Sequence, residues 1–214
     1  MTTCVIIPVF NLSSHRFENF KFLLTQLVKL GVSDIYVIEQ VTENKNVSKL
    51  TRMFGSVKYI PIVIEEGEFN KSNLINTFVS TIKYDYVWMI DCDVYLNFSY
   101  VLKNIPTKFH FIRPYQYIIK LSATESDHLI KTERIKIESK PPNLNNAFGK
   151  YSFIICKQLF DDMGGYDINF KGWGYQDLDL VKRLPQKSII GYTDNTAFHL
   201  YHKPASLTNY SQNK

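Results

Sequence analysis

The stretch "YDYVWMIDCDVYL" (residues 84–96) is an apolar run that ends in two aspartates separated by one cysteine. Its apolar part predicts a buried strand. Because side chains two residues apart in a strand point to the same face, we expect Asp91 and Asp93 to share one face and Cys92 to point to the other. Two neighbouring carboxylates repel each other, so the pair requires a divalent cation, a shared proton or water at the strand end.

Strands and helices alternate in the sequence that precedes this stretch. Short β-rich runs predict strands at residues 3–11, 34–40 and 57–64. Apolar residues at helical spacing predict a helix over residues 16–30, ended by Gly31, and a second helix that opens at Asn70. This order predicts an α/β fold, with a mostly parallel central sheet flanked by helices and a ligand site beyond the carboxyl ends of the strands.

The second half of the chain is less regular. Residues 122–146 are polar, charged and interrupted by two prolines, which is typical of a surface loop or flap. Residues 151–156 predict a strand, and residues 157–163 predict a short helix stopped by two glycines. A further helix is predicted at residues 177–184, where Pro185 halts it.

Length and composition limit the possible functions. A chain of 214 residues with 45% hydrophobic residues is expected to form one domain, and its polar end suggests one domain of a longer enzyme. A net charge of +5 without a long Lys/Arg block favours a small anionic ligand such as a phosphate over nucleic acid. Three cysteines without metal spacing indicate free thiols, and the absence of a leader and of a long apolar stretch predicts a cytoplasmic chain without a membrane span.

Three further groups of residues are candidates for a site. Trp173 lies between two glycines, where its indole can form the wall of a sugar pocket or simply pack in the core. Asp177 and Asp179 open a helix, which is also where acidic side chains offset the helix dipole. Since side chains two apart on a helix diverge by about 200°, at most one of them faces a pocket. His199 and His202 are structural or complete a metal shell of mixed oxygen and nitrogen ligands.

These segments together resemble the A-type (GT-A) glycosyltransferases, in particular inverting enzymes of the galactosyltransferase and chondroitin-polymerase kind. The resemblance spans nearly the whole chain and lies in five motifs in order: "CVIIPVFN", "YVIEQ", "FNKSNLIN", "DCD" as the DxD motif, and "GWGYQDLDL" as the GWGxEDxD motif. It implies a nucleotide-binding part over residues 1–113 and an acceptor-binding, catalytic part over residues 114–214. The implied reaction moves a sugar from a nucleotide-sugar donor, a UDP-sugar, to a glycan or glycoprotein.

The resemblance also implies roles for individual residues. The residues expected to contact the nucleotide-sugar donor, through its nucleotide, its diphosphate or its sugar, are Pro8, Val9, Phe10, Asn11, Glu39, Asn70, Lys71, Asp91, Trp173 and His202. Asp91, Asp93 and His199 are the implied ligands of a divalent metal, manganese or alternatively magnesium, although the spacing leaves the roles of His199 and His202 interchangeable. Asp177 aligns with the catalytic base. Gln176 departs from the family, which usually has Glu there, so sugar specificity is in doubt.

The residue types fit the chemistry of glycosyl transfer. A divalent ion stabilises the negative charge that develops on the departing diphosphate. A carboxylate on the opposite face, Asp177, accepts the proton of the attacking hydroxyl, and a single displacement from that face inverts the anomeric centre.

Two other readings remain open from the sequence. A haloacid-dehalogenase-type phosphatase also has Asp-x-Asp after an apolar strand, with the first Asp as nucleophile, although that motif usually opens the fold. A catalytically idle module that keeps the nucleotide pocket is the second, and Gln176 is its main support.

Overall fold

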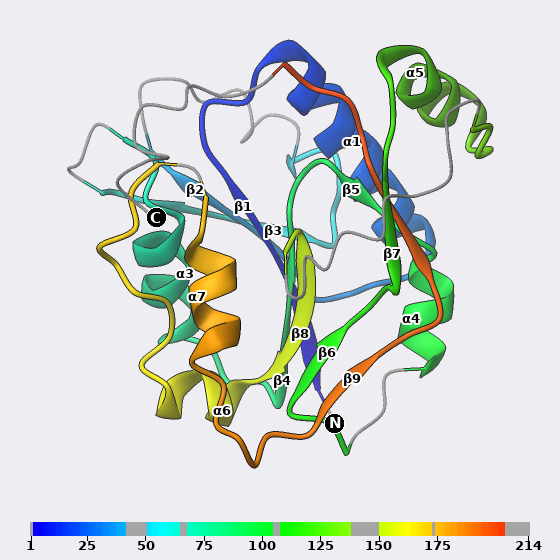
Figure 1. The fold of residues 1–214 in the computed structure, drawn as a ribbon. Helices are drawn as coiled ribbons and strands as arrows, with labels where there is room; N and C mark the ends of the chain where they lie inside the picture. Colours follow the sequence, from blue (N-terminus) through cyan, green and yellow to red (C-terminus); the bar gives the residue numbers. More distant parts are fainter. Residues whose placement is uncertain are drawn as a thin grey trace.

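The structure, a computed structural model, describes residues 2–41, 51–64, 68–104, 108–137, 150–172 and 174–203. Its main sheet has seven strands in the order β3-β2-β1-β4-β8-β6-β9 (Figure 1). These strands are β1 (Thr3–Val9), β2 (Ile35–Gln40), β3 (Val57–Ile62), β4 (Tyr86–Ile90), β6 (Phe111–Arg113), β8 (Ser152–Cys156) and β9 (Ile190–Tyr192). The predicted α/β class with a mostly parallel central sheet is confirmed.

The centre of the sheet is parallel and buried. β1 pairs in parallel with β2 on one side and with β4 on the other, so three carboxyl ends lie together at one edge. β8 is the exception to the parallel pattern, because it runs antiparallel to both β4 and β6. The sheet therefore brings residues from both halves of the chain to the end of β4.

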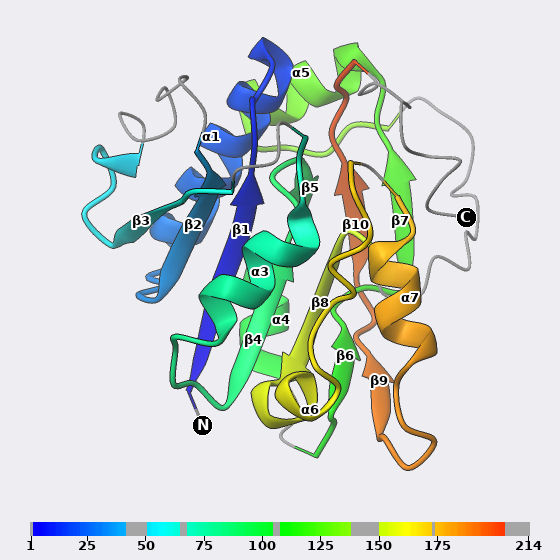
Figure 2. The same cartoon turned by 90° about the vertical axis from the view of Figure 1, so that its left-hand side faces the viewer.

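Helices cover both faces of the sheet (Figures 1 and 2). One face packs against α1 (Ser14–Lys29), whose Phe20, Leu23, Leu24 and Leu27 are fully or almost fully buried. The other face packs against α3 (Lys71–Val79), α6 (Lys157–Asp162) and α7 (Gln176–Lys182). α4 (Phe98–Asn104) packs on the α1 side through Phe98. The helices expected near residues 16–30, 70–82, 157–163 and 177–184 are all present, within a few residues of the predicted ends.

A small second sheet joins the chain end to the strand that follows the DCD sequence. Its order is β5 (Val94–Tyr95), β10 (Thr196–His199) and β7 (Tyr117–Lys120). β10 is antiparallel to β5 and parallel to β7, with His199 opposite Val94. Residues about 100 positions apart thus become neighbours. The expected closeness of His199 to Asp93 does not include this strand pairing, which the sequence did not predict.

The loop predicted over residues 122–146 is wrong for its first part. Residues Ala123–Thr132 form α5, whose first turn is closed by a capping box between Ser122 and Glu125. The helix buries Leu129 against the second sheet. Residues 133–137 form neither helix nor strand, as predicted, and residues 138–146 lie outside the described residues.

The cysteine and membrane predictions also have a structural outcome. All three cysteines are free thiols, with Cys4 and Cys92 buried and Cys156 half-buried. Among the helices in the described ranges, none is both long and apolar enough to cross a bilayer.

Candidate active site

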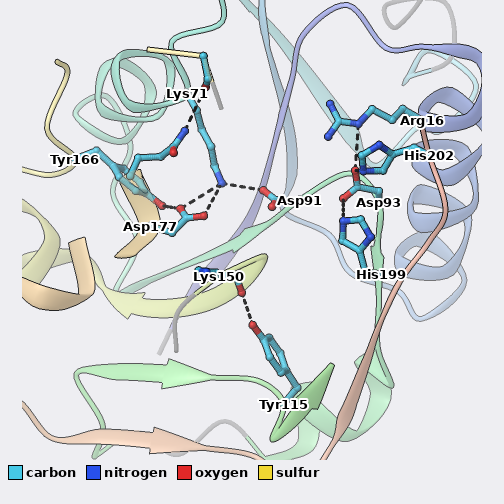
Figure 3. Close-up of polar contacts among 12 residues, drawn as sticks. Arg16, Lys71, Asp91, Asp93, Tyr115, Lys150, Tyr166, Asp177, His199 and His202 are labelled. Atoms are coloured by element: carbon cyan, nitrogen blue, oxygen red, sulfur yellow. Dashed lines mark hydrogen bonds and ion pairs between the residues drawn. The ribbon is translucent and has the colours of Figure 1, made fainter. Parts of the chain in front are cut away.

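The two aspartates of the DCD sequence lie in a turn and not in a strand. β4 ends at Ile90, and the Val94 backbone N–H donates to the carbonyl of Asp91 at 3.2 Å, which closes the turn. The carboxylates consequently point toward different partners, Asp91 toward Lys71 and Asp93 toward Arg16 and two histidines (Figure 3). The expectation that Asp91 and Asp93 share one face is therefore wrong. β4 ends at Ile90, so the alternation of side chains along a strand does not apply to the two aspartates.

Asp93 is the centre of the first cluster, which we call the Asp93 cluster: Asp93, His199, His202 and Arg16. The Asp93 side chain is only 3% exposed. His202 Nε2 lies 3.2 Å from its Oδ2, and His199 Nε2 lies 3.7 Å from its Oδ1. One ligand atom from each of Asp93, His199 and His202 lies within 4.8 Å of the other two.

Backbone contacts hold the two histidines against Asp93. The strand pairing of β10 with β5 places His199 beside the residue that follows Asp93, and the Leu200 N–H donates to the Asp93 carbonyl at 2.9 Å. The next residue, Tyr201, is fixed on both sides. Its N–H donates to Ser126 Oγ at 2.8 Å, and its carbonyl accepts from Asn19 Nδ2 at 3.1 Å. The chain is therefore held at two successive residues just before His202.

The charges of the Asp93 cluster are set by burial and by close contacts. Burial alone raises the pKa of Asp93, but His202, His199 and Arg16 together outweigh it and hold that pKa well below its usual range. Burial lowers the pKa of His199. The contact with Asp93 raises the pKa of His202. Asp93 is thus an anion at neutral pH, and His199 is a neutral imidazole that can donate an electron pair.

This donor set fits a divalent metal ion. One carboxylate and two imidazoles form the mixed oxygen and nitrogen shell that manganese, zinc and related ions accept. In addition, Asp93 Oδ2 is buried and makes no hydrogen bond within the described part of the chain, even though two nitrogens lie near it. A buried carboxylate oxygen without a hydrogen bond is costly unless a further ligand satisfies it.

The ligand set differs from the one expected. Sequence reasoning paired Asp91 with Asp93 and placed His202 at the diphosphate, whereas here His202 is as close to Asp93 as any other group and Asp91 lies outside the cluster. The assignment of Asp91 to the metal and of His202 to the diphosphate stays a prediction.

The second cluster lies on the other side of the turn, and we call it the Lys71 cluster: Lys71, Asp91, Asp177 and Tyr166 (Figure 3). The buried Lys71 ammonium lies 2.8 Å from Asp91 Oδ1 and 3.2 Å from both carboxylate oxygens of Asp177. Burial raises the pKa of Asp91 to about 6 despite the opposing effect of Lys71. Burial lowers the pKa of Lys71, but its two carboxylate partners outweigh this and raise it above its usual value.

Local sequence features bring α3 and α7 to this cluster. Asn70 caps α3 by accepting a hydrogen bond from the Asn73 N–H at 2.9 Å, which confirms the predicted helix start and places Lys71 at its first residue. α7 begins after Gly172, Gly174 and Tyr175, all of which have positive φ. The Gly172 N–H donates to the Phe69 carbonyl at 2.7 Å, so the loop before Asp177 is bound to the loop before Lys71.

Asp177 and Asp179 have separate environments, as helical geometry predicts. Asp177 faces Lys71, whereas Asp179 pairs with Arg183 one turn further along α7 at 2.7 Å. Tyr166 is a residue that sequence reasoning missed. Its buried hydroxyl donates to Asp177 Oδ1 at 2.7 Å, and its backbone is fixed by two hydrogen bonds with Asn76. Gly165 allows this approach, since a Cβ there would lie 2.4 Å from Asn76 Oδ1.

The residues expected at the nucleotide lie at the carboxyl ends of β1 and β2. Val9 is opposite Glu39 in the parallel register, and Glu39 accepts a hydrogen bond from the Tyr59 hydroxyl at 2.6 Å. Phe10 stacks on Phe69 with ring centroids 5.4 Å apart. Burial raises the pKa of Glu39.

Three other predicted residues frame the same edge. Pro8 lies within β1 opposite Ile38, and Asn11 follows the strand in the left-handed region with a φ of 41°. The Asn70 N–H donates to Gln40 Oε1 at 2.8 Å, which ties the start of α3 to the end of β2. Trp173 lies outside the described residues, so its predicted place at a sugar pocket stays a prediction.

Comparison with known proteins gives a likeness in fold. No protein-family model matches the chain, and no curated protein sequence matches it. Solved structures do match: GalNAc-T7 with UDP, GalNAc and Mn²⁺ has a TM-score of 0.65 at 14% identity, covering 99% of this chain and 47% of that one. Drosophila beta1,4-galactosyltransferase 7 with xylobiose has a TM-score of 0.58 at 16% identity, covering 99% of this chain and 78% of that one.

A bacterial enzyme also resembles this chain in fold. TarS of S. aureus, in complex with UDP-GlcNAc, has a TM-score of 0.62 at 11% identity and covers 96% of this chain and 60% of that one. The chain spans about half the length of GalNAc-T7 and 60% of that of TarS. The described residues of the chain thus have the fold of the A-type glycosyltransferases.

Proposed function

We propose that the chain is a metal-dependent glycosyltransferase that moves a sugar from a UDP-sugar to a glycan or glycoprotein acceptor with inversion at the anomeric carbon. The Asp93 cluster is the observation that carries this proposal. It places one carboxylate and two imidazoles, from two segments about 100 residues apart in the chain, beyond the end of β4. In open α/β sheets this edge is where ligands bind.

The likeness to solved structures supports the choice of donor and metal. GalNAc-T7 was solved with UDP and Mn²⁺, and glucosyl-3-phosphoglycerate synthase of Mycobacterium tuberculosis, with a TM-score of 0.57 at 11% identity, was also solved with Mn²⁺ and UDP. A divalent ion held by Asp93, His199 and His202 supplies Lewis-acid stabilisation of the charge on a departing diphosphate.

The chain's own residues divide the remaining tasks. Glu39 and the end of β1 bind the nucleoside, because they lie at the same edge as the Asp93 cluster. Asp177 accepts the proton of the acceptor hydroxyl. Lys71 and Tyr166 orient its carboxylate, with contacts to both oxygens from Lys71 and to one from Tyr166.

The fold argues against the phosphatase reading. The Asp-x-Asp sequence follows the fourth strand of the chain, β4. In that class of phosphatase the motif usually opens the fold, so its place after three earlier strands does not fit.

A transfer assay tests the proposal. UDP release is measured from UDP-Glc, UDP-Gal, UDP-GlcNAc and UDP-GalNAc, each with a panel of glycan acceptors and with MnCl₂ or EDTA. We expect UDP release from at least one donor that depends on both metal and acceptor, with a product whose anomeric configuration, read by NMR, is opposite to that of the donor. Manganese-dependent UDP binding without turnover on any donor would support the idle binding module. Phosphate release from small phosphomonoesters would support the phosphatase.

A further inference from the structure

Arg16 is a charged residue of the Asp93 cluster for which the sequence patterns predicted no role. It lies in the first turn of α1, and its Nε is 3.2 Å from Asp93 Oδ2. Neither of these two buried atoms makes a hydrogen bond within the described part of the chain, so their contact is electrostatic and poorly aligned. Both groups keep unused capacity for a partner: Asp93 for a cation and Arg16 for an anion.

The position of Arg16 on its helix also favours an anion beside the guanidinium. The first turn of α1 contains no acidic residue, and Ser13 makes no capping hydrogen bond with its side chain. A positive charge in a first turn opposes the helix dipole and costs stability unless an anion lies nearby. Asp93 is one such anion, and the guanidinium, whose side chain is 27% exposed, also reaches solvent.

The balance of charge changes when a divalent ion binds. Before binding, the charges of Asp93 and Arg16 cancel each other. A metal at Asp93, His199 and His202 then adds two positive charges next to a guanidinium that does not lose its proton at any relevant pH. Arg16 therefore opposes binding of the metal alone. A diphosphate relieves this repulsion, because a guanidinium fork binds phosphate oxygens in a bidentate manner.

We propose that Arg16 is an anion-binding residue that couples the binding of the divalent ion to the binding of a nucleoside diphosphate. It pairs with Asp93 when neither ligand is bound, and turns to the phosphates when both are. The metal then binds weakly by itself and tightly with the nucleotide. This inference rests on the proposed function, since it assigns a residue to that same site.

A simpler role for Arg16 is to tether α1 to the end of β4. A tether predicts that loss of Arg16 lowers the melting temperature while the effect of UDP on metal affinity is unchanged. The coupling role predicts a change in that effect, which a purely structural contact does not produce.

The experiment is a thermodynamic cycle measured by calorimetry on wild type and Arg16→Gln. MnCl₂ is titrated with and without saturating UDP, and UDP is titrated with and without saturating MnCl₂. In Arg16→Gln we expect manganese alone to bind about tenfold more tightly and the factor by which UDP enhances manganese binding to fall about tenfold or more. Arg134→Gln removes the same charge from an exposed position after α5 and should leave the cycle unchanged.

Arg16→Lys provides a second comparison if Arg16→Gln does not fold. It keeps the charge but not the bidentate fork, so manganese alone should still bind weakly while UDP enhances it less than in wild type. A wild-type enhancement factor in either folded variant overturns the inference. If wild type binds manganese and UDP independently of each other, Arg16 couples nothing. If wild type binds neither, the proposed function fails as well.

Discussion

Replacing Lys71 with methionine should destabilise the protein through the two carboxylates that it leaves behind. Methionine keeps the length and apolar stem of the lysine but removes the ammonium that contacts Asp91 and Asp177. Removing one partner of a fully buried ion pair costs about 3–5 kcal/mol. Because Asp91 is 29% exposed and Asp177 is 16% exposed, solvent reduces the expected cost to about 2–3 kcal/mol.

Thermal and urea unfolding at neutral pH measure this cost. A loss of this size lowers the melting temperature by roughly 5–10 °C in a chain of this length. Lys58→Met is the matched control. Its ammonium pairs with Asp34 at 2.9 Å at the surface, where the lysine side chain is 47% exposed, and such pairs contribute at most about 1 kcal/mol.

The difference in stability between Lys71→Met and wild type should depend on pH. Without Lys71, Asp91 loses the positive charge that lowers its pKa and keeps the repulsion from Asp177, so the pKa of Asp91 in the folded state rises further above the unfolded value. A raised carboxyl pKa costs stability at pH values above it, and this cost disappears as the pH falls through the folded pKa. The gap between variant and wild type should therefore shrink between neutral pH and about pH 5. A variant that melts with wild type, or a gap that widens in acid, would refute the account of Lys71.

Asp177→Asn should lower the transfer rate by about 10²-fold or more while donor affinity stays nearly unchanged, and Asp179→Asn should have little effect, as steady-state rates and UDP titrations will show. Equal losses in both variants would contradict the assignment of the base. Gly165→Ala should cost about 1–3 kcal/mol more than Gly164→Ala in urea unfolding, since both glycines have a φ near +70° but only at Gly165 does a Cβ overlap Asn76. Equal losses of stability in Gly165→Ala and Gly164→Ala would show that the positive φ, and not the overlap with Asn76, determines the cost.

The order of elements was predictable because it depends on local patterns. The buried runs of β1, β2 and β4 and the helical spacing of Phe20, Leu24 and Leu27 are set by the core alone. α5 was also within reach, since Ser122 and Glu125 form a capping box pattern that the sequence displays. Its mostly polar residues and the two prolines that follow instead favour a loop.

The site was predictable in its residues but less so in its arrangement. Asp93 and His199 were expected together, and the structure brings them together through the pairing of β10 with β5. The divergence of Asp91 from Asp93 depends on where β4 stops, which no local pattern determines. Arg16 and Tyr166 could not be found, because their contacts depend on how α1 and the loop before α7 pack on distant segments.

The measurement that tests the central claim most directly is the calorimetric titration of UDP into wild type and Asp93→Asn, with and without MnCl₂. If Asp93, His199 and His202 hold the ion, manganese should tighten UDP binding to wild type by at least about tenfold, and this gain should be lost in Asp93→Asn. Asp127→Asn, an exposed position on α5, should behave as wild type, and a melting curve confirms that each variant is folded. A folded Asp93→Asn protein that retains the full effect of manganese would contradict the metal site.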